Sequence, residues 1–196
     1  MSILLAYKRK DTVYMGTDTR VIVNDVKRSE LCVCNHKIQR LENGILLGAS
    51  AERLERQTIF AYSDLFTLDK NGELTKKHLV KEVVPKLYKV LQREGLLVEK
   101  EGEIPYMRAV LLLAYKDTLF EICAGFTVLR YEDCQALGFA SDYAQSTLMN
   151  VKETDDVNTQ IVKALDIAAK YCQYVGAPYL LIDTKEGEYQ LVKGDK

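Results

Sequence analysis

The chain has 196 residues, of which 47% are hydrophobic, and its 27 basic and 28 acidic residues leave a formal net charge of −1. The length and apolar fraction predict one globular domain over residues 1–196 with a sizeable core, and they exclude global disorder. The balanced charge gives no electrostatic reason to expect nucleic acid as a partner. No apolar run approaches the ~20 residues of a membrane-spanning helix, so no membrane partner is expected either.

The N-terminus and the cysteines favour a cytoplasmic protein. Residues 1–6 are apolar, but no basic segment precedes them and basic residues follow soon after, which is not the pattern of a signal peptide. The five cysteines are scattered and odd in number, so we expect reduced thiols. Cys32 and Cys34 lie near His36, but zinc sites usually separate two cysteines by two to four residues and use a second pair. A buried apolar strand over residues 31–34 is the preferred interpretation.

Strand-forming segments fill the first quarter of the chain. Apolar or alternating stretches predict strands over residues 2–7, 12–15, 21–23, 37–41 and 45–49. Turn-prone residues at 8–11 predict a hairpin between the first two strands. The Glu-Asn-Gly sequence at 42–44 is a second turn signal, between the last two.

Helical spacing follows. A helix is expected over residues 51–66, with an inward face made of Leu54, Thr58, Ile59, Tyr62, Leu65 and Phe66. A solvated face, rather than a contact between subunits, is expected for its charged residues Glu52, Arg53, Glu55 and Arg56. A second helix is expected over residues 75–93, kinked or split by Pro85 and ended by Glu94 and Gly95.

The second half of the chain repeats this order. Strands are expected over residues 107–115 and 119–123, with a tight turn at 116–117. A small-residue segment at 135–141 leads into a helix that ends near Met149, for which Ser141 or Asp142 is the expected cap. A third amphipathic helix is expected over 155–174, with inward residues Val157, Ile161, Val162, Leu165 and Ala168 or Ala169. A last hairpin pairs residues 179–183 with 188–192.

The order of elements predicts an α+β fold. Strands, two helices, strands, two helices and strands follow one another, which is not the alternation that builds a parallel sheet. Two antiparallel sheets stacked face to face, with a helix pair outside each, would bury all the apolar faces. We therefore expect a four-layer αββα sandwich.

Several short stretches share their order and spacing with one known family. An apolar strand that begins at Ser2 is followed by GTDTR at 16–20, KIQRL at 37–41 and NGILL at 43–47. Later come ALGFASDYA at 136–144 and AAK at 168–170, with Gly176 after them. Together these stretches resemble the proteasome β-type subunits, including the related bacterial HslV peptidase, of the N-terminal nucleophile hydrolase superfamily. The resemblance covers nearly the whole chain.

The resemblance implies both a fold and a mechanism. Members of this family share the αββα sandwich, and their nucleophile is the first residue of the mature chain, whose own α-amino group accepts the proton. Removal of Met1 would make Ser2 that residue. Asp18 and Lys37 then match the catalytic Asp and Lys of the family, in which the ammonium activates the nucleophile and the carboxylate orients the ammonium.

Other positions match the family in part. The resemblance implies supporting roles for Arg20, Gly138 and Ser141. Three polar side chains of the family are absent, because Phe139, Cys172 and Val175 stand in their places. The glycine whose N–H holds the oxyanion is also absent, and Ser50, Ala51 or Glu52 occupies that region.

These features favour an N-terminal serine hydrolase that cleaves peptide or other amide bonds. The alternative is a catalytically inactive ring or scaffold subunit, and a third interpretation is an amidase of non-peptide substrates. The resemblance implies a peptide or protein substrate, a homo-oligomeric ring and, as in some bacterial members, an ATP-dependent unfoldase as partner. It implies no metal and no organic cofactor.

Overall fold

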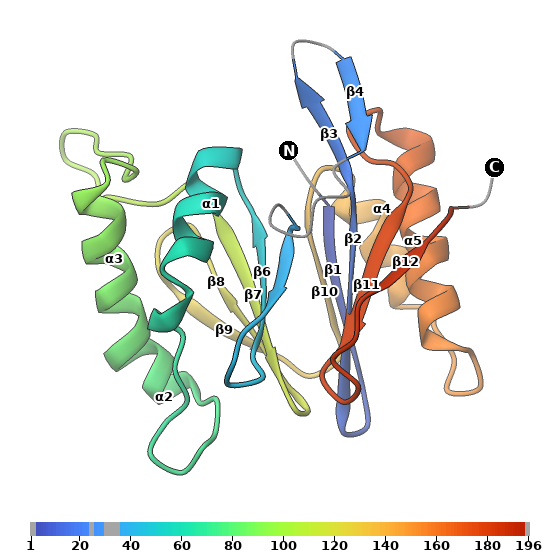
Figure 1. The fold of residues 1–196 in the computed structure, drawn as a ribbon, viewed down its shortest axis with the longest axis horizontal. Helices are drawn as coiled ribbons and strands as arrows, with labels where there is room; N and C mark the ends of the chain where they lie inside the picture. Colours follow the sequence, from blue (N-terminus) through green and yellow to red (C-terminus); the bar gives the residue numbers. More distant parts are fainter. Residues whose placement is uncertain (1–2, 24–25, 30–35, 195–196) are drawn as a thin grey trace.

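The computed structural model describes residues 3–23, 26–29 and 36–194, and this part of the chain contains two five-stranded antiparallel sheets (Figure 1). The first sheet has the order β10-β1-β2-β11-β12, from β1 (Ile3–Arg9), β2 (Thr12–Asp18), β10 (Cys134–Gly138), β11 (Tyr179–Asp183) and β12 (Gln190–Val192). The second has the order β5-β6-β7-β8-β9, from β5 (Ile38–Arg40), β6 (Leu46–Ser50), β7 (Val110–Tyr115), β8 (Thr118–Ile122) and β9 (Val128–Tyr131). A ribbon of β3 (Arg20–Val23) and β4 (Val26–Ser29) extends beyond β2.

Helices cover the outer face of each sheet (Figure 1). The second sheet carries α1 (Arg53–Ala61) and a helical stretch made of α2 (Lys76–His78), a π-helical segment (Leu79–Val83) and α3 (Val84–Arg93). The first sheet carries α4 (Ser141–Leu148) and α5 (Val157–Tyr171). The predicted four-layer αββα sandwich is therefore confirmed.

Three apolar clusters join the four layers. The cluster between the sheets includes Leu4, Met15, Leu46 and Leu112, all of which are fully buried. A second cluster joins the β5–β9 sheet to α1 and the 76–93 helical stretch, and a third joins the other sheet to α4 and α5. Successive residues of a strand point to opposite sides of the sheet. The central strands therefore contribute apolar side chains both to the cluster between the sheets and to the cluster under the helices.

The predicted hairpins are confirmed. Strand β1 pairs with β2, β5 with β6, β7 with β8 and β11 with β12. Strands β4 and β9 were not predicted. The small-residue segment forms β10, and residues 31–34 lie outside the described residues.

Helix α1 corrects two predictions. The helix ends at Ala61 rather than continuing to residue 66, and a short 3₁₀ turn follows. Leu54 is 66% exposed, so it does not belong to the inward face, whereas Ile59 and Phe66 are buried as expected. Glu55 and Arg56 are only 4% and 5% exposed, so of the expected solvated face only Glu52 and Arg53 are exposed. The buried carboxylate of Glu55 accepts the backbone N–H of Arg108 at 2.9 Å, which fixes this side of the helix against the start of β7.

The other helices differ from the predicted helices mainly at their ends. Pro85 follows the π-helical segment, so the helical stretch continues through the predicted break with altered spacing. Neither Ser141 nor Asp142 caps α4, because Ala140 occupies the cap position in a left-handed conformation (φ 60°) and Ser141 is already helical. Helix α5 ends at Tyr171, three residues earlier than expected, and Cys172 is extended.

Candidate active site

Asp18 and Lys37 form a buried ion pair between the two sheets. The Lys37 Nζ lies 2.6 Å from Asp18 Oδ1, and the two side chains are 3% and 0% exposed. Asp18 is the last residue of β2, and Lys37 directly precedes β5. The pair therefore joins the ends of two strands that belong to different sheets.

The same carboxylate contacts the start of β1. The backbone N–H of Ile3 donates to Asp18 Oδ1 at 3.2 Å, and the Thr17 hydroxyl donates to the Ile3 carbonyl at 2.6 Å. Ser2 and Met1 lie outside the described residues. The structure thus brings Asp18 and Lys37 together beside the residue that follows Ser2.

Arg20 connects this pair to the turn after α5. Its backbone N–H donates to Asp18 Oδ2 at 3.2 Å, and its carbonyl accepts from Lys37 Nζ at 3.1 Å. Its guanidinium donates to the carbonyls of Gln173 (3.0 Å) and Val175 (2.5 Å). The supporting position predicted for Arg20 therefore contacts both charged residues, through its backbone.

The turn after α5 also holds the end of β2. The backbone N–H and hydroxyl of Thr19 both donate to the Pro178 carbonyl, at 3.1 and 2.8 Å. Val175 is fully buried in the apolar cluster under α5, and Cys172 packs against that cluster. The backbone of the turn makes these polar contacts, in the region where the family would place polar side chains.

Burial makes the Asp18–Lys37 pair costly to keep unless it is well hydrogen-bonded. Removing two charges from water carries a desolvation cost that Coulomb attraction offsets only with good geometry. Here Lys37, Ile3 and Arg20 all donate to the Asp18 carboxylate. These three hydrogen bonds supply the good geometry that the buried carboxylate requires.

Gly138 and Ser141 lie on the opposite side of β1. Gly138 faces Ile3 across the β1–β10 pair and has a φ of 95°, which a residue with a side chain rarely adopts. Ser141 is the first residue of α4, and among the described residues its side chain makes no hydrogen bond to Asp18 or Lys37. Between them, Phe139 is 42% exposed, with its ring 5.5 Å from that of Tyr174.

A cavity of about 450 Å³ opens next to these residues. Its walls are the end of β6, the start of α1, Arg108 and the loop into α4, with the lining residues Ser50, Ala51, Glu52, Arg108, Gly138, Phe139, Ala140, Ser141 and Asp142. Ser50, Ala51 and Glu52 are the residues expected to replace the oxyanion glycine. Nothing in the sequence pattern singles out Arg108 as a lining residue.

Next to this cavity lies a buried acid that sequence reasoning also missed, Glu55, whose carboxylate accepts the N–H of the lining residue Arg108. Burial raises the pKa of the Glu55 carboxyl above its usual range, although the backbone N–H groups of Ala109 and Arg108 act in the opposite direction. Glu55 follows Glu52 by three residues in the same acidic and basic run, and the local pattern does not distinguish the buried acid from the exposed one.

No metal site is evident in the part of the chain that the structure describes, where no three His, Cys, Asp or Glu side chains are placed to share an ion. Cys32 and Cys34 lie outside the described residues, so their preferred interpretation as a strand stays a prediction. Within the described residues, no helix is long and apolar enough to cross a membrane.

Comparisons with known proteins show which solved structures share this architecture. No protein-family model and no curated protein sequence matches the chain. Solved structures match it closely in fold, and they establish that the chain has the four-layer fold of the proteasome β-type and HslV-like proteins. The resemblance drawn from the sequence is confirmed.

Three of these structures illustrate the match. BPH from Thiobacillus denitrificans superposes with a TM-score of 0.72 at 19% identity, covering 92% of this chain and 96% of that chain. HslV from Trypanosoma brucei has a TM-score of 0.61 at 16% identity over 92% and 98%. Anbu, described as an ancestral β-subunit, from Yersinia bercovieri has a TM-score of 0.69 at 12% identity over 98% and 88%.

Proposed function

We propose that the chain is an N-terminal serine hydrolase of peptide or other amide bonds, with Ser2 as nucleophile once Met1 is removed. The observation that carries this proposal is the buried Lys37–Asp18 pair, whose shared oxygen also accepts the N–H of Ile3. A chain kept only for its shape has no need for an ammonium buried at this position, because an apolar pair of similar volume is often at least as stable.

In the proposed reaction the Ser2 hydroxyl oxygen attacks the carbonyl carbon of the amide. The α-amino group of Ser2 accepts the hydroxyl proton, since an α-amine titrates near neutral pH. The Lys37 ammonium stabilises the oxygen as it loses the proton, and Asp18 orients the ammonium. Collapse of the tetrahedral intermediate transfers the proton to the leaving amine and forms an ester on Ser2, which water then hydrolyses.

The cavity beside Gly138 is the proposed place for the substrate. A backbone N–H from residues 50–52 would donate to the oxyanion, a contact worth about 3–4 kcal/mol of activation free energy. This donor does not depend on a side chain, so the missing family glycine does not by itself remove it.

The proposal also includes the location, the assembly and the partners that the family resemblance implies. The chain would act in the cytoplasm as a homo-oligomeric ring on a peptide or protein substrate, with an ATP-dependent unfoldase as partner. The fold shared with HslV and Anbu supports a ring-forming subunit.

A catalytically inactive ring subunit is the second candidate. It is favoured by Val175, which is buried among apolar side chains, and by Phe139, which occupies the loop next to Gly138. Under this alternative the ion pair would only join the two sheets.

Intact-protein mass spectrometry with a peptide epoxyketone separates these candidates. One matched structure is BPH in complex with epoxomicin, which makes epoxomicin a suitable probe. We expect loss of the Met1 mass and an adduct that maps to Ser2 and is absent from Ser2→Ala, a variant that still permits removal of Met1. A processed chain that never labels would support the inactive subunit, and retained Met1 would exclude the proposed mechanism.

A further inference from the structure

We propose that the helical stretch 76–93 and the loop before it form a docking surface for an acidic segment of a partner protein. The surface, called here the basic face, consists of the side chains of Lys70, Lys76, Lys77, Lys81 and Lys89. All five are exposed. Neither the proposed hydrolysis nor the Asp18–Lys37 pair uses any of them.

The helical stretch 76–93 is much more basic than the chain as a whole. Residues 76–93 contain six basic residues and one acidic residue, whereas the whole chain has a net charge of −1. Like charges at helical neighbour positions repel one another, so the arrangement costs stability in the free protein. A negatively charged partner would reverse this cost.

The lysines of the basic face are available for such a partner. Within the described residues, none of the five lysine side chains forms an ion pair or a hydrogen bond. Glu82, the one acid in the helical stretch, pairs with Lys86 at 3.9 Å. Asp69, which lies beside Lys70, accepts the N–H groups of Asn71 and Glu73 at 2.9 and 3.1 Å.

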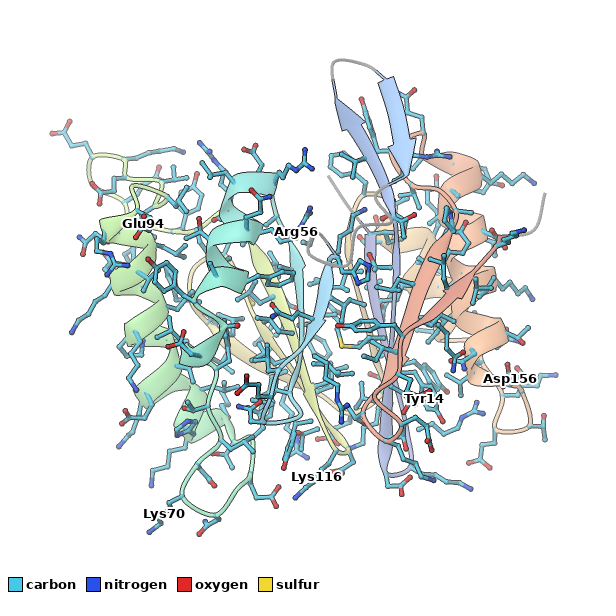
Figure 2. The ribbon with its side chains drawn as sticks, viewed as in Figure 1. Tyr14, Arg56, Lys70, Glu94, Lys116 and Asp156 are labelled. Carbon is cyan, nitrogen blue, oxygen red and sulfur yellow. The ribbon has the colours of Figure 1, made fainter. Side chains whose placement is uncertain are left out.

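The basic face also has a hollow. A cavity of about 530 Å³ lies between the loop and the helix. Lys70, Lys77 and Lys81 line it, together with Asp69, Asn71, Thr75, His78 and Glu82. Its size is sufficient for one or two side chains of a bound segment. Figure 2 labels Lys70 at the lower end of the outer helical layer.

The chemistry of the basic face fits a peptide better than a nucleic acid. Val80 is 47% exposed between Lys76, Lys77 and Lys81, so an apolar side chain of the partner can be covered there. All five cations are lysines, which lack the planar fork with which arginine binds phosphates and bases. The aromatic ring of Tyr88 packs against Phe126, which leaves it half-buried rather than free to stack on a base.

The position of the basic face separates docking from catalysis. Helix α2 lies at the end of the sandwich opposite the C-terminal end of β2, where Asp18 lies (Figure 1). A partner bound there would leave the candidate active site open. Docking at the basic face can therefore be tested separately from the proposed hydrolysis.

Fluorescence anisotropy with the full chain tests the inference. The probe is a fluorescein-labelled peptide rich in Asp and Glu with a central Leu, and the reference peptide replaces each acid by its amide. We expect the acidic peptide to bind and the amide peptide not to, with affinity falling as salt increases. The double variant Lys77→Glu/Lys81→Glu should bind the acidic peptide at least about tenfold more weakly. The control Lys163→Glu/Lys193→Glu makes the same charge change at exposed lysines elsewhere and should bind like the parent.

Three results would overturn the inference. Equal weakening by the two double variants would show that only net charge matters. Single-stranded DNA or anionic vesicles that bind the parent more tightly than the acidic peptide would indicate a nucleic acid or membrane surface instead. A loss of oligomer mass in light scattering of Lys77→Glu/Lys81→Glu alone would show that the basic face contacts a second copy of the chain. The variant Val80→Ser, which keeps every charge, should weaken peptide binding about two- to fivefold if the apolar contact is made.

Discussion

The guanidinium of Arg20 lies directly against Gly176, where a Cβ atom would stand only 2.1 Å from Cζ and from one terminal nitrogen of the arginine. This contact holds the turn after α5 against the residue whose backbone meets both Asp18 and Lys37. While the guanidinium keeps its hydrogen bonds to the Gln173 and Val175 carbonyls, only a residue without a side chain fits between it and the turn. The position of Gly176 in the family resemblance thus has a physical reason in this chain.

Replacing Gly176 by alanine should therefore displace Arg20 and loosen the ion pair. We expect Gly176→Ala to lower the free energy of unfolding by about 1–3 kcal/mol through overpacking, and to slow epoxyketone labelling of Ser2. Thermal unfolding and labelling rates measure the two effects. Gly125→Ala is the matched control, because nothing lies within 4 Å of a Cβ at that position. Equal effects of the two substitutions would show that the contact has no role.

The buried pair predicts a non-additive result. Either Asp18→Asn or Lys37→Met alone leaves one partner buried without its counter-charge, which should cost about 3–5 kcal/mol of stability. The double variant removes both charges and should be more stable than the Lys37→Met single variant. Urea unfolding of all four proteins gives the coupling energy. All three variants should lose epoxyketone labelling, and labelling that survives Lys37→Met would remove Lys37 from the proposed mechanism.

Glu55 should make stability depend on pH in a defined direction. Its pKa in the folded protein is raised above the ordinary value of 4.5 because burial disfavours the charged form. The folded state then holds the proton more tightly than the unfolded state, so stability is lost as the pH rises from about 4.5 through the folded pKa. Glu55→Gln should remove this loss and flatten the profile relative to the parent protein.

The control for Glu55 is Glu52→Gln, at an exposed position in the cavity rim one turn away. Unfolding free energies at a series of pH values from acid to neutral would be compared for the three proteins. A Glu55→Gln profile parallel to that of the parent would contradict the prediction. A glutamine can still accept the Arg108 N–H through its carbonyl oxygen, so the variant changes the charge with little change of shape.

How far the sequence predicts this structure depends on the range of the contacts involved. The strand pairs β1–β2 and β7–β8 are joined by short turns, so local patterns predict them. The exposure of Glu55 was wrongly predicted because its carboxylate is held by the backbone N–H of Arg108, far along the chain, and nothing near Glu55 signals that contact. Strand β9 was missed because it is short and two of its residues are exposed.

In the candidate site, too, local patterns were predictable from the sequence and contacts between distant residues were not. Asp18 and Lys37 were singled out from the resemblance, but only the stacking of two sheets brings their side chains to 2.6 Å. Cys172 and Val175 stand where the family has polar side chains, which suggested that the residues around Asp18 and Lys37 are held less firmly. The contacts of Arg20 and Thr19 with carbonyls of the same turn replace part of that support, and backbone acceptors leave no mark in a sequence.

Cys123 offers a prediction outside the site. Burial, together with the nearby Glu121 carboxylate, raises the pKa of the Cys123 thiol to about 11. Because the thiolate is the reactive form, Cys123 should react with iodoacetamide at pH 8 roughly 100-fold more slowly than an ordinary exposed thiol. Peptide mass spectrometry over a time course, with glutathione as the reference thiol, measures the rate. Glu121→Gln should raise the rate by a smaller factor, since burial remains the larger cause, and fast alkylation of the parent would contradict the prediction.

Phe139 should limit the size of what reaches the proposed nucleophile. Its ring lines the cavity beside Gly138, the residue that faces Ile3, and it is held there by its contact with the ring of Tyr174. Phe139→Ser would widen the cavity while costing little stability, because the ring is already 42% exposed. We expect the labelling rate of a bulky epoxyketone, relative to a small one, to rise several-fold.

The control for Phe139 is Tyr143→Ser, which removes a comparably exposed ring on α4. Tyr143 stacks on Tyr171 at 4.7 Å between ring centres and does not line this cavity. The ratio of bulky to small labelling should therefore stay at the parental value in this variant. A ratio that rises equally in both would mean that loosening α4, rather than opening the cavity, admits the larger probe. A ratio unchanged in Phe139→Ser would mean that the substrate reaches Ser2 by another route.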